Sequence, residues 1–255
     1  FTDLDEALTA IRTYVAANPK TNLFAKSDFL TPNKTYDDWI RFANSLRLRL
    51  AMRLSNVDPS KAAEEAKKAL SDEGGVLEAP TDVIAVNAST SGFTNPLGEI
   101  NKGWHEVFMN ASMESFLVGY DDPRISKYFT PAAGGSEGAL FNIAGTYKGV
   151  RQGTGVTHNK YKDHSPSTVA QNTDAILLTA AEVWFLRAEA ALRGYISGDA
   201  GEYYKKGVET SFAQWGAGSA AEYLESEKTP ADYKDAFDAK FDAKAESTVT
   251  PKWDN

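Results

Sequence analysis

Two pairs of helices, far apart in the sequence, constrain most strongly how this chain can fold. In each pair a long apolar helix is followed, after a short turn, by a second helix; the long helices are expected at 36–55 and 176–193. In the first of them Trp39, Phe42 and Leu46 recur at the spacing of one helix face. A stripe of this kind has to be covered, so each pair is expected to fold into a helical hairpin.

The second helix of each pair has recognisable start and stop signals. Asp58 is the expected N-cap before Pro59 at the first helical position, and Gly74 follows the last turn. In the other pair, Asp199 is expected to cap a helix that runs to Trp215. The fold is therefore predicted to be mostly α, with hairpins similar to tetratricopeptide units and a loop-rich, mixed insertion between them.

The insertion differs from the hairpins in composition. Residues 76–172 are rich in Gly, Asn, Ser, Thr and Pro, with a short strand expected at 82–86 and a helix at 112–118. A loop region of this length inside a compact domain is usually functional. We therefore expect a single domain over 1–255, in which a helical scaffold at 3–75 and 173–216 carries a loop-rich ligand region.

One more periodic segment follows near the end of the chain, at 230–246. Tyr233, Phe237 and Phe241 are spaced four residues apart, and the sequence DAFDAKFDAK keeps the remaining positions small or charged. This pattern predicts a C-terminal amphipathic helix with one solvated face.

Composition excludes several classes of protein and site. With 27 Lys and Arg against 35 Asp and Glu, the net charge of −8 argues against nucleic-acid binding, which needs a surplus of cations. The chain has no cysteine, so disulfides, thiolate zinc sites and cysteine nucleophiles are excluded. The absence of cysteine is also weak evidence of an oxidising compartment.

Catalytic and metal motifs are weak. The segment 134–138 matches the G-x-S-x-G pattern of a nucleophile elbow around Ser136, but no strand precedes it, and a flexible loop is expected instead. Asp121 and Asp122 could bind calcium, although turn formation before Pro123 explains both. The histidines lack metal-ligand spacing and are expected to be exposed on loops: His105, His158 and His164.

Four sequence motifs occur in an order that is specific when they are taken together. They are YDDWIRFANSLRLRLAMRLS at 36–55, GYDDPRISKYFTP at 119–131, TYKGVRQGTG at 146–155, and AEVWFLRAEAALRGY followed by YYKKGVETSFAQWG at 181–216. In this order they resemble the motifs of SusD-like proteins, the SusD/RagB group. The resemblance covers most of the chain.

The resemblance implies a surface-exposed, lipid-anchored outer-membrane protein of a Gram-negative bacterium that binds glycan and is not an enzyme. It implies no cofactor, and as partner a TonB-dependent, SusC-like transporter that the protein caps like a lid. The lipobox cysteine of the family is absent, as are helices expected before Phe1 and a motif expected after Asn255. The chain is therefore expected to be the central part of a longer protein.

Glycan binding makes a particular demand on side chains. The C–H face of a sugar lies on an aromatic ring, and its hydroxyls need amides and charged groups, best placed on loops held by a rigid scaffold. We expect Trp104 to be the stacking platform, with a core tryptophan as the alternative. The candidate glycan-binding residues are Phe93, Asn101, Trp104, Tyr147, Arg151, Asn159 and Tyr161.

Two other functions stay open at this point. The helical hairpins could form a protein-interaction module of an outer-membrane complex that binds no sugar. A hydrolase using Ser136 or a pair of carboxylates is the third possibility. Titration against a panel of glycans separates the first two functions, and loss of hydrolysis on Ser136→Ala would identify the third.

Overall fold

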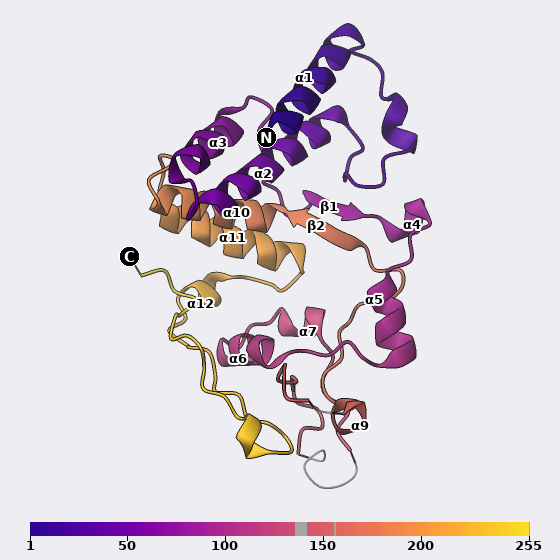
Figure 1. The fold of residues 1–255 in the computed structure, drawn as a ribbon, viewed down its shortest axis with the longest axis vertical. Helices are drawn as coiled ribbons and strands as arrows, with labels where there is room; N and C mark the ends of the chain where they lie inside the picture. The colour runs from indigo at the N-terminus through magenta and orange to yellow at the C-terminus, as the bar shows by residue number, and fades with distance from the viewer. Residues whose placement is uncertain (136–141, 156, 255) are drawn as a thin grey trace. The chain divides into compact units, whose positions relative to one another are not determined.

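The computed structural model describes residues 1–135, 142–155 and 157–254 and is mostly helical (Figure 1). It divides into two compact units: Phe1–Ser91 with Asp174–Gln214, and Gly92–Thr173 with Trp215–Asp254. The single domain that we expected is thus two units. The later boundaries lie within two residues of the predicted scaffold limits of 173 and 216, but the first unit continues well beyond residue 75.

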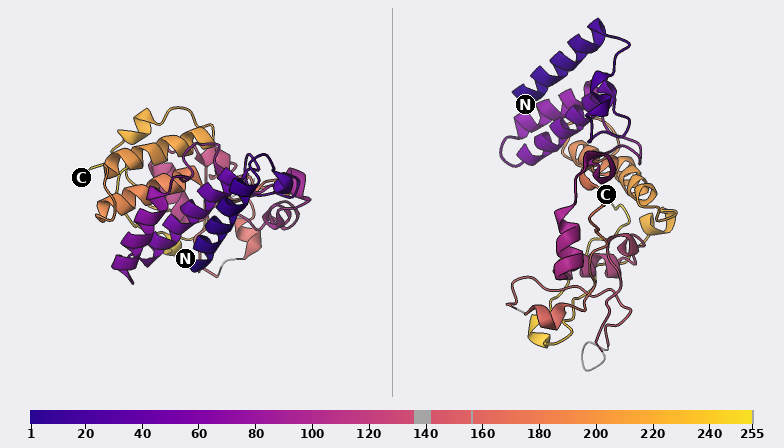
Figure 2. Two further views of the ribbon diagram at one scale, coloured as in Figure 1. Left: turned by 90° about the horizontal axis from the view of Figure 1, so that it is seen from above. Right: turned by 90° about the vertical axis from the view of Figure 1, so that its right-hand side faces the viewer.

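The first unit holds the helical hairpins and a small sheet. Helices α1, α2 and α3 lie side by side, and α10 packs along α11 (Figures 1 and 2). Its elements are α1 (Thr2–Ala17), η1 (Leu23–Lys26), α2 (Tyr36–Leu54), α3 (Pro59–Ser71), β1 (Val83–Val86), α4 (Ala88–Ser91), β2 (Ala175–Thr179), α10 (Ala180–Leu192) and α11 (Ala200–Gln214).

The helices begin where their capping residues place them. Thr35 and Asp38 form a capping box at the start of α2, and the side chains of Asp58 and Asp199 accept backbone N–H bonds at the starts of α3 and α11. The helix predicted at 176–193 begins four residues late. Residues 175–179 instead pair with β1 in an antiparallel ladder, and Thr179 caps α10 by accepting from the Glu182 N–H.

The core of the first unit lies between the two hairpins and the sheet. Leu48 and Ala51 of α2 pack with Ala66 of α3, Ile84 of β1 and Val183 of α10, all of them fully buried. The small side chains of Ala51 and Ala66 allow close approach of the helices. Burial of a side chain such as Leu48 contributes roughly 2 kcal/mol.

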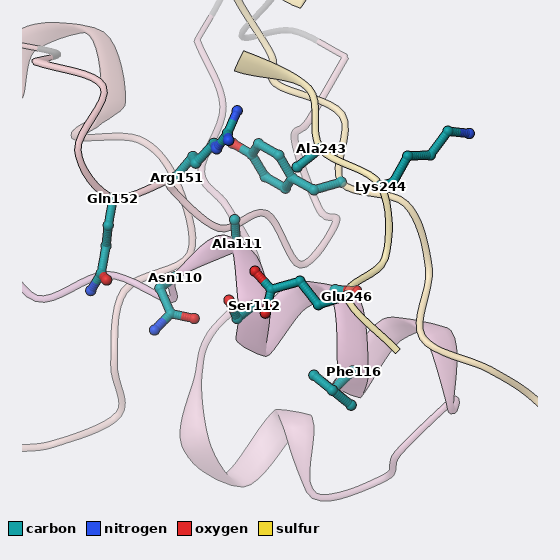
Figure 3. A pocket seen from close by; sticks show the side chains of 11 residues that line it. Asn110, Ala111, Ser112, Phe116, Arg151, Gln152, Ala243, Lys244 and Glu246 are labelled. Carbon is teal, nitrogen blue, oxygen red and sulfur yellow. The ribbon is translucent and has the colours of Figure 1, made fainter. Parts of the chain in front are cut away.

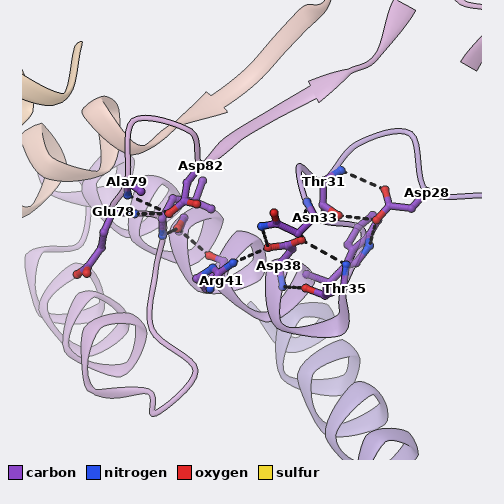
Figure 4. Close-up of polar contacts among 12 residues, drawn as sticks. Asp28, Thr31, Asn33, Thr35, Asp38, Arg41, Glu78, Ala79 and Asp82 are labelled. Atoms are coloured by element: carbon purple, nitrogen blue, oxygen red, sulfur yellow. Dashed lines mark hydrogen bonds and ion pairs between the residues drawn. The ribbon is translucent and has the colours of Figure 1, made fainter. Parts of the chain in front are cut away.

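Two buried carboxylates order the polar segment between α1 and α2 (Figure 4). Asp28 accepts the backbone N–H groups of Leu30 and Thr31 and the indole N–H of Trp39 at 2.9, 3.1 and 3.0 Å. Asp38 accepts the Asn33 backbone N–H at 2.9 Å. For both aspartates burial raises the pKa, but the hydrogen bonds outweigh it and the pKa is lowered overall.

The second unit has short helices joined by ordered loops. Its core contains Met109, Leu117 and Ile125, with Tyr147 packed against them. Its elements are α5 (Pro96–Glu99), the π-helical turn η2 (Ile100–Trp104), α6 (Ala111–Gly119), α7 (Ile125–Tyr128), α9 (His158–Tyr161), α12 (Ala221–Leu224) and η3 (Ala239–Phe241). None of the helices described in either unit is long and apolar enough to cross a membrane.

The prediction of a C-terminal helix at 230–246 is wrong. Tyr233 and Ala243 pair as an isolated antiparallel bridge, and only Ala239–Phe241 form a short 3-10 turn. Asp235 accepts the N–H groups of Phe237 and Asp238, and Asp242 accepts that of Asp235. These side chains take the backbone bonds that a helix needs, so the aspartates favour turns despite the helical spacing of the aromatic residues.

Candidate functional site

A pocket of about 200 Å³ in the second unit is the candidate site (Figure 3). It lies among the start of α6, the loop that carries Arg151, and the C-terminal segment, by which we mean residues 233–246. Its lining residues are Asn110, Ala111, Ser112, Ser115, Phe116, Arg151, Gln152, Tyr233, Ala243, Lys244 and Glu246. The Lys244 side chain points away from the others in Figure 3 and pairs with Asp232 at 2.6 Å.

Backbone bonds hold the first two segments together. Asn110 and Val150 form a parallel bridge, in which the Ala111 N–H donates to the Val150 carbonyl at 3.0 Å. Gly149 makes this approach possible, because a Cβ at that position would lie 2.5 Å from the Asn110 carbonyl oxygen. The Asn110 side chain caps α6 by accepting from the Met113 N–H at 2.7 Å.

Arg151 joins its loop to the C-terminal segment. Its Nη1 donates to the carbonyl oxygens of Phe241 and Asp242 at 3.1 and 3.2 Å. A guanidinium has five N–H donors, so this anchoring leaves donors for a ligand. Arg151 therefore holds the pocket in shape and also contributes to its polar lining.

A buried polar network around Lys148 and Glu114 holds Tyr233, one of the residues that line the pocket. The Lys148 ammonium donates to Glu114 at 2.6 Å and lies 4.5 Å from the centre of the Tyr233 ring. The second Glu114 oxygen accepts the Gly149 N–H at 2.7 Å. Burial raises the pKa of Glu114 although Lys148 opposes it, and burial together with Asp235 raises that of Tyr233. The Tyr233 hydroxyl therefore stays protonated and lies 3.1 Å from the Gly149 carbonyl oxygen.

The pocket also has polar lining groups that no described residue engages. The side chains of Ser112, Gln152 and Glu246 have no hydrogen-bond or ion-pair partner among the residues that the structure describes. The half-buried ring of Phe116 also lines the pocket and lies below Glu246 in Figure 3. A hydroxyl, an amide, a carboxylate and an apolar ring around one opening suit a ligand that has both hydroxyls and a C–H face.

Of the predicted glycan-binding residues, Arg151 lines the pocket, and Trp104 is presented separately to solvent. Trp104 ends η2 and is 61% exposed, so it is not a core tryptophan. Its turn is docked by Asn101, which donates to the carbonyl oxygens of Ser167 and Val169 at 2.6 and 2.9 Å. Asn101 thus positions the Trp104 turn, and its amide N–H groups are already used.

Two predicted tyrosines are packed into the second unit. Tyr161 is 3% exposed; its ring lies 5.3 Å from that of Phe237, and its hydroxyl lies near Asp235. Burial and Asp235 raise the pKa of Tyr161 to about 12. Because its ring is covered, Tyr161 cannot stack on a sugar, and this prediction is wrong for the structure. Tyr147 is half-buried against the Met109 cluster.

The remaining predicted residues are dispersed. Phe93 is half-buried, and Asn159 is exposed on α9. Among the histidines, His105 is exposed as expected, but His164 is 1% exposed and packed against Tyr161, which corrects the expectation of a solvated loop residue. Burial lowers the pKa of His164 to about 4, with a further contribution from the Lys148 ammonium.

Sequence reasoning missed the pocket residues that come from α6 and from the C-terminal segment. Asn110 was identifiable as a helix cap before Ala111. Glu246 was missed because it was assigned to the incorrectly predicted helix at 230–246. The aspartates at 232, 235, 238 and 242 were the available signal, since closely spaced aspartates favour turns.

The catalytic and metal candidates find no support in the described part of the chain. Ser136 lies outside the described residues. Asp122 is buried and paired with Arg124, and Asp121 pairs with Lys228. Among the residues with defined positions, no cluster of three or more His, Asp or Glu is arranged to hold a metal ion.

Comparison with known proteins points to one family. The family described as "SusD-like: Susd and RagB outer membrane lipoprotein" matches residues 1–255. No curated protein sequence matches the chain.

Solved structures of SusD homologues superpose closely. One from Bacteroides vulgatus is 44% identical with a TM-score of 0.88, covering 99% of this chain and 50% of that one. A chitin-binding SusD homologue from Flavobacterium johnsoniae is 36% identical with a TM-score of 0.90, covering 100% and 51%. A SusD-like protein from Bacteroides thetaiotaomicron is 33% identical with a TM-score of 0.89, covering 100% and 52%. The chain therefore spans about half the length of these structures.

Proposed function

The chain belongs to the SusD-like family of outer-membrane lipoproteins, and we propose that it binds a glycan at the cell surface as part of a polysaccharide uptake system. The observation that carries this proposal is the pocket around Arg151, which is lined by the Phe116 ring and by Ser112, Gln152 and Glu246, all three unpartnered among the described residues. Similarity to a chitin-binding homologue supports a glycan as the ligand.

Trp104 is the proposed stacking platform for the sugar. In the free protein the apolar Trp104 ring is exposed to water, which is unfavourable. A sugar face stacked on the ring would cover this surface. Asn101 and the carbonyl groups of Ser167 and Val169 hold its turn in place, so the ring is presented on an anchored turn. Anchoring reduces the ordering cost of binding.

We propose further that the protein delivers the glycan to a SusC-like, TonB-dependent transporter and is held at the outer membrane by a lipid anchor. Membership of the SusD-like family supports this partnership. Binding is proposed to involve no catalysis and no cofactor. Addition of EDTA should therefore leave the affinity unchanged, and the glycan should be recovered intact.

Calorimetric titration of the intact protein with chitin oligosaccharides and a panel of other neutral glycans tests the proposal. Replacing Trp104 by Ala removes a solvent-exposed ring, and it should weaken binding about tenfold, which corresponds to about 1.4 kcal/mol. Thermal stability should be unchanged, because the ring is not part of the core.

Leu23→Ala is the matched control, since Leu23 is another exposed apolar side chain and lies outside the site. It should alter neither binding nor stability. Unfolding of the Trp104→Ala protein would instead give the tryptophan a structural role. Failure of every glycan to bind, with a transporter still bound, would leave the alternative of a protein-interaction module without sugar binding.

A further inference from the structure

A second pocket, in the first unit, is the feature of the molecule that the proposed function leaves unexplained. It has a volume of about 480 Å³ and is lined by residues from the end of α3, from α10 and the loop after it, and from α11. Leu70 and Ile196 provide its apolar lining, and Lys67, Arg187 and Tyr203 are prominent among its polar groups. We call it the α3–α10–α11 pocket.

The charge of this pocket is opposite in sign to that of the chain. The chain carries a net charge of −8, yet none of the described lining residues is acidic. The Arg187 guanidinium lies 4.3 Å from the centre of the Trp184 ring, and Lys206 lies 4.8 Å from the same ring. Of these two cations, Arg187 lines the pocket, and an anion there would be attracted to it.

Most polar groups of the pocket have no partner among the described residues. Within the described structure, the Lys67 ammonium, the Ser71 and Ser197 hydroxyls and the Tyr203 phenol have no hydrogen-bond or ion-pair partner. Arg187 is engaged, by Glu78 at 2.6 Å, but Glu78 is exposed and such a pair is weak. A ligand carboxylate can share or replace it.

A neighbouring pocket shows the opposite arrangement. The pocket among α1, α2 and α3 is also lined by charged groups and has a volume of about 310 Å³. There Arg12 pairs with Asp72 at 2.5 Å and Lys68 pairs with Asp5 at 2.7 Å, so the cations are neutralised by the chain itself. The contrast indicates that the positive charge of the α3–α10–α11 pocket is left for a ligand.

We propose that the α3–α10–α11 pocket is a second carbohydrate site, which takes a uronic acid residue of an acidic glycan. Lys67 and Arg187 bind the carboxylate, and the hydroxyls of Ser71, Ser197 and Tyr203 bind the hydroxyls of the sugar. The volume is typical of a site for a small ligand, which favours one sugar residue over an extended acidic peptide. The site does not depend on the neutral-glycan pocket around Arg151.

Calorimetric titration of the intact protein with trigalacturonate, and with its methyl ester, tests this assignment. The acid carries charged carboxylates, and the ester carries neutral methyl ester groups in the same positions, so the acid should bind and the ester should bind at least about tenfold more weakly. Lys67→Gln should weaken binding of the acid by about tenfold. Glu78→Gln removes the carboxylate that competes for Arg187, and it should strengthen binding by about threefold.

Lys20→Gln is the matched control, since Lys20 is an exposed lysine that does not line the pocket. It makes the same change in net charge and should leave the affinity unaltered. Equal binding of acid and ester, an effect of Lys67→Gln no larger than that of the control, or no binding of trigalacturonate overturns the proposal. Binding of hexaglutamate that depends on Lys67, without binding of trigalacturonate, assigns the pocket to an acidic protein partner instead.

Trp104→Ala should leave the affinity for trigalacturonate unchanged, which separates this site from the proposed neutral-glycan site.

Discussion

Buried polar side chains are the residues whose roles depend most on their neighbours. Arg47 of α2 is 0% exposed and pairs with both Glu65 of α3 and Asp5 of α1, so it ties three helices together. Removal of one partner of such a group leaves a charge buried without compensation, which costs several kcal/mol. The sequence around Arg47 does not reveal this role, because an arginine between the apolar residues of a helix more often keeps its charged group in water.

His164 should make the stability of the protein depend on pH. Its folded pKa of about 4 lies below the ordinary 6.5, so between these values the unfolded chain binds more protons than the folded one. The stabilising contribution is complete above pH 6.5 and is lost as the pH falls toward 4. Between pH 7 and pH 5 the free energy of unfolding should fall by about 2 kcal/mol through this residue, measured by urea denaturation.

His164→Phe should remove this part of the pH dependence. Neither ring nitrogen of His164 has a hydrogen-bond partner among the described residues, so the phenyl ring loses no bond and keeps the contacts with Tyr161 and Phe237. The exposed His105, changed to Asn, is the control and should keep the wild-type slope. An unchanged slope in His164→Phe would contradict the assignment.

At the level of elements, capping residues and turn-forming aspartates decided the boundaries. Thr179 separates strand β2 from helix α10 inside a segment that reads as one apolar run. Asp235 and Asp242 convert a segment with helical spacing into turns that meet in the Tyr233–Ala243 bridge. In both places hydrogen bonds that backbone N–H groups donate to a side chain outweigh the helical spacing of the apolar residues.

Gly149→Ala should disrupt the junction between α6 and the Arg151 loop. The added Cβ would meet the Asn110 carbonyl oxygen at 2.5 Å, and a backbone atom cannot move aside without breaking the Asn110–Val150 bridge. We expect a loss of about 1–3 kcal/mol in the free energy of unfolding, together with weaker glycan binding.

Gly103→Ala provides the comparison. There the nearest atom is the end of the flexible Glu99 side chain, at 2.8 Å, which can rotate away. Urea denaturation should place this variant within about 0.5 kcal/mol of the wild type. If Gly149→Ala were equally mild, the close approach of the two segments would not determine the shape of the pocket.

For the whole molecule, charge is distributed unevenly. The net charge is −8, but the α3–α10–α11 pocket gathers cations, and the pocket around Arg151 combines Arg151 and Lys244 with Glu246. Long-range repulsion by the net charge therefore disfavours anions in general, and an anionic ligand binds only where local cations outweigh it. Neutral glycans are insensitive to this field.

The two proposed sites should consequently differ in salt dependence. Raising the salt concentration from 50 to 500 mM should change the affinity for a neutral glycan by less than about twofold, since no net charge is screened. The affinity for trigalacturonate should fall clearly over the same range. Calorimetry at the two salt concentrations measures both, and a large loss for the neutral glycan would show that charge contributes to its binding.

Much of the helical scaffold was predictable, because each helix carries its own period and its own caps. Residues 36–55, 59–71 and 200–214 were placed to within a residue or two. Of the predicted glycan-binding residues, Arg151 lines the candidate pocket, and Trp104 is exposed on its turn, where its role in binding stays a prediction. Tyr161 was assigned to the site for its position on a loop, although the structure buries it, because loop position does not tell which side of a loop packs inward.

The sequence by itself determined the family, the mostly helical hairpins and the loop-rich character of 76–172, since these depend on local spacing and on motifs read in order. Only the tertiary structure decided the division into two units and the pocket around Arg151. It joins Asn110 to Val150 and Tyr233 to Ala243, and pairings between distant segments leave no period in the sequence. Which polar groups remain free for a ligand also depends on such pairings, because a side chain is available only where the fold has given it no partner.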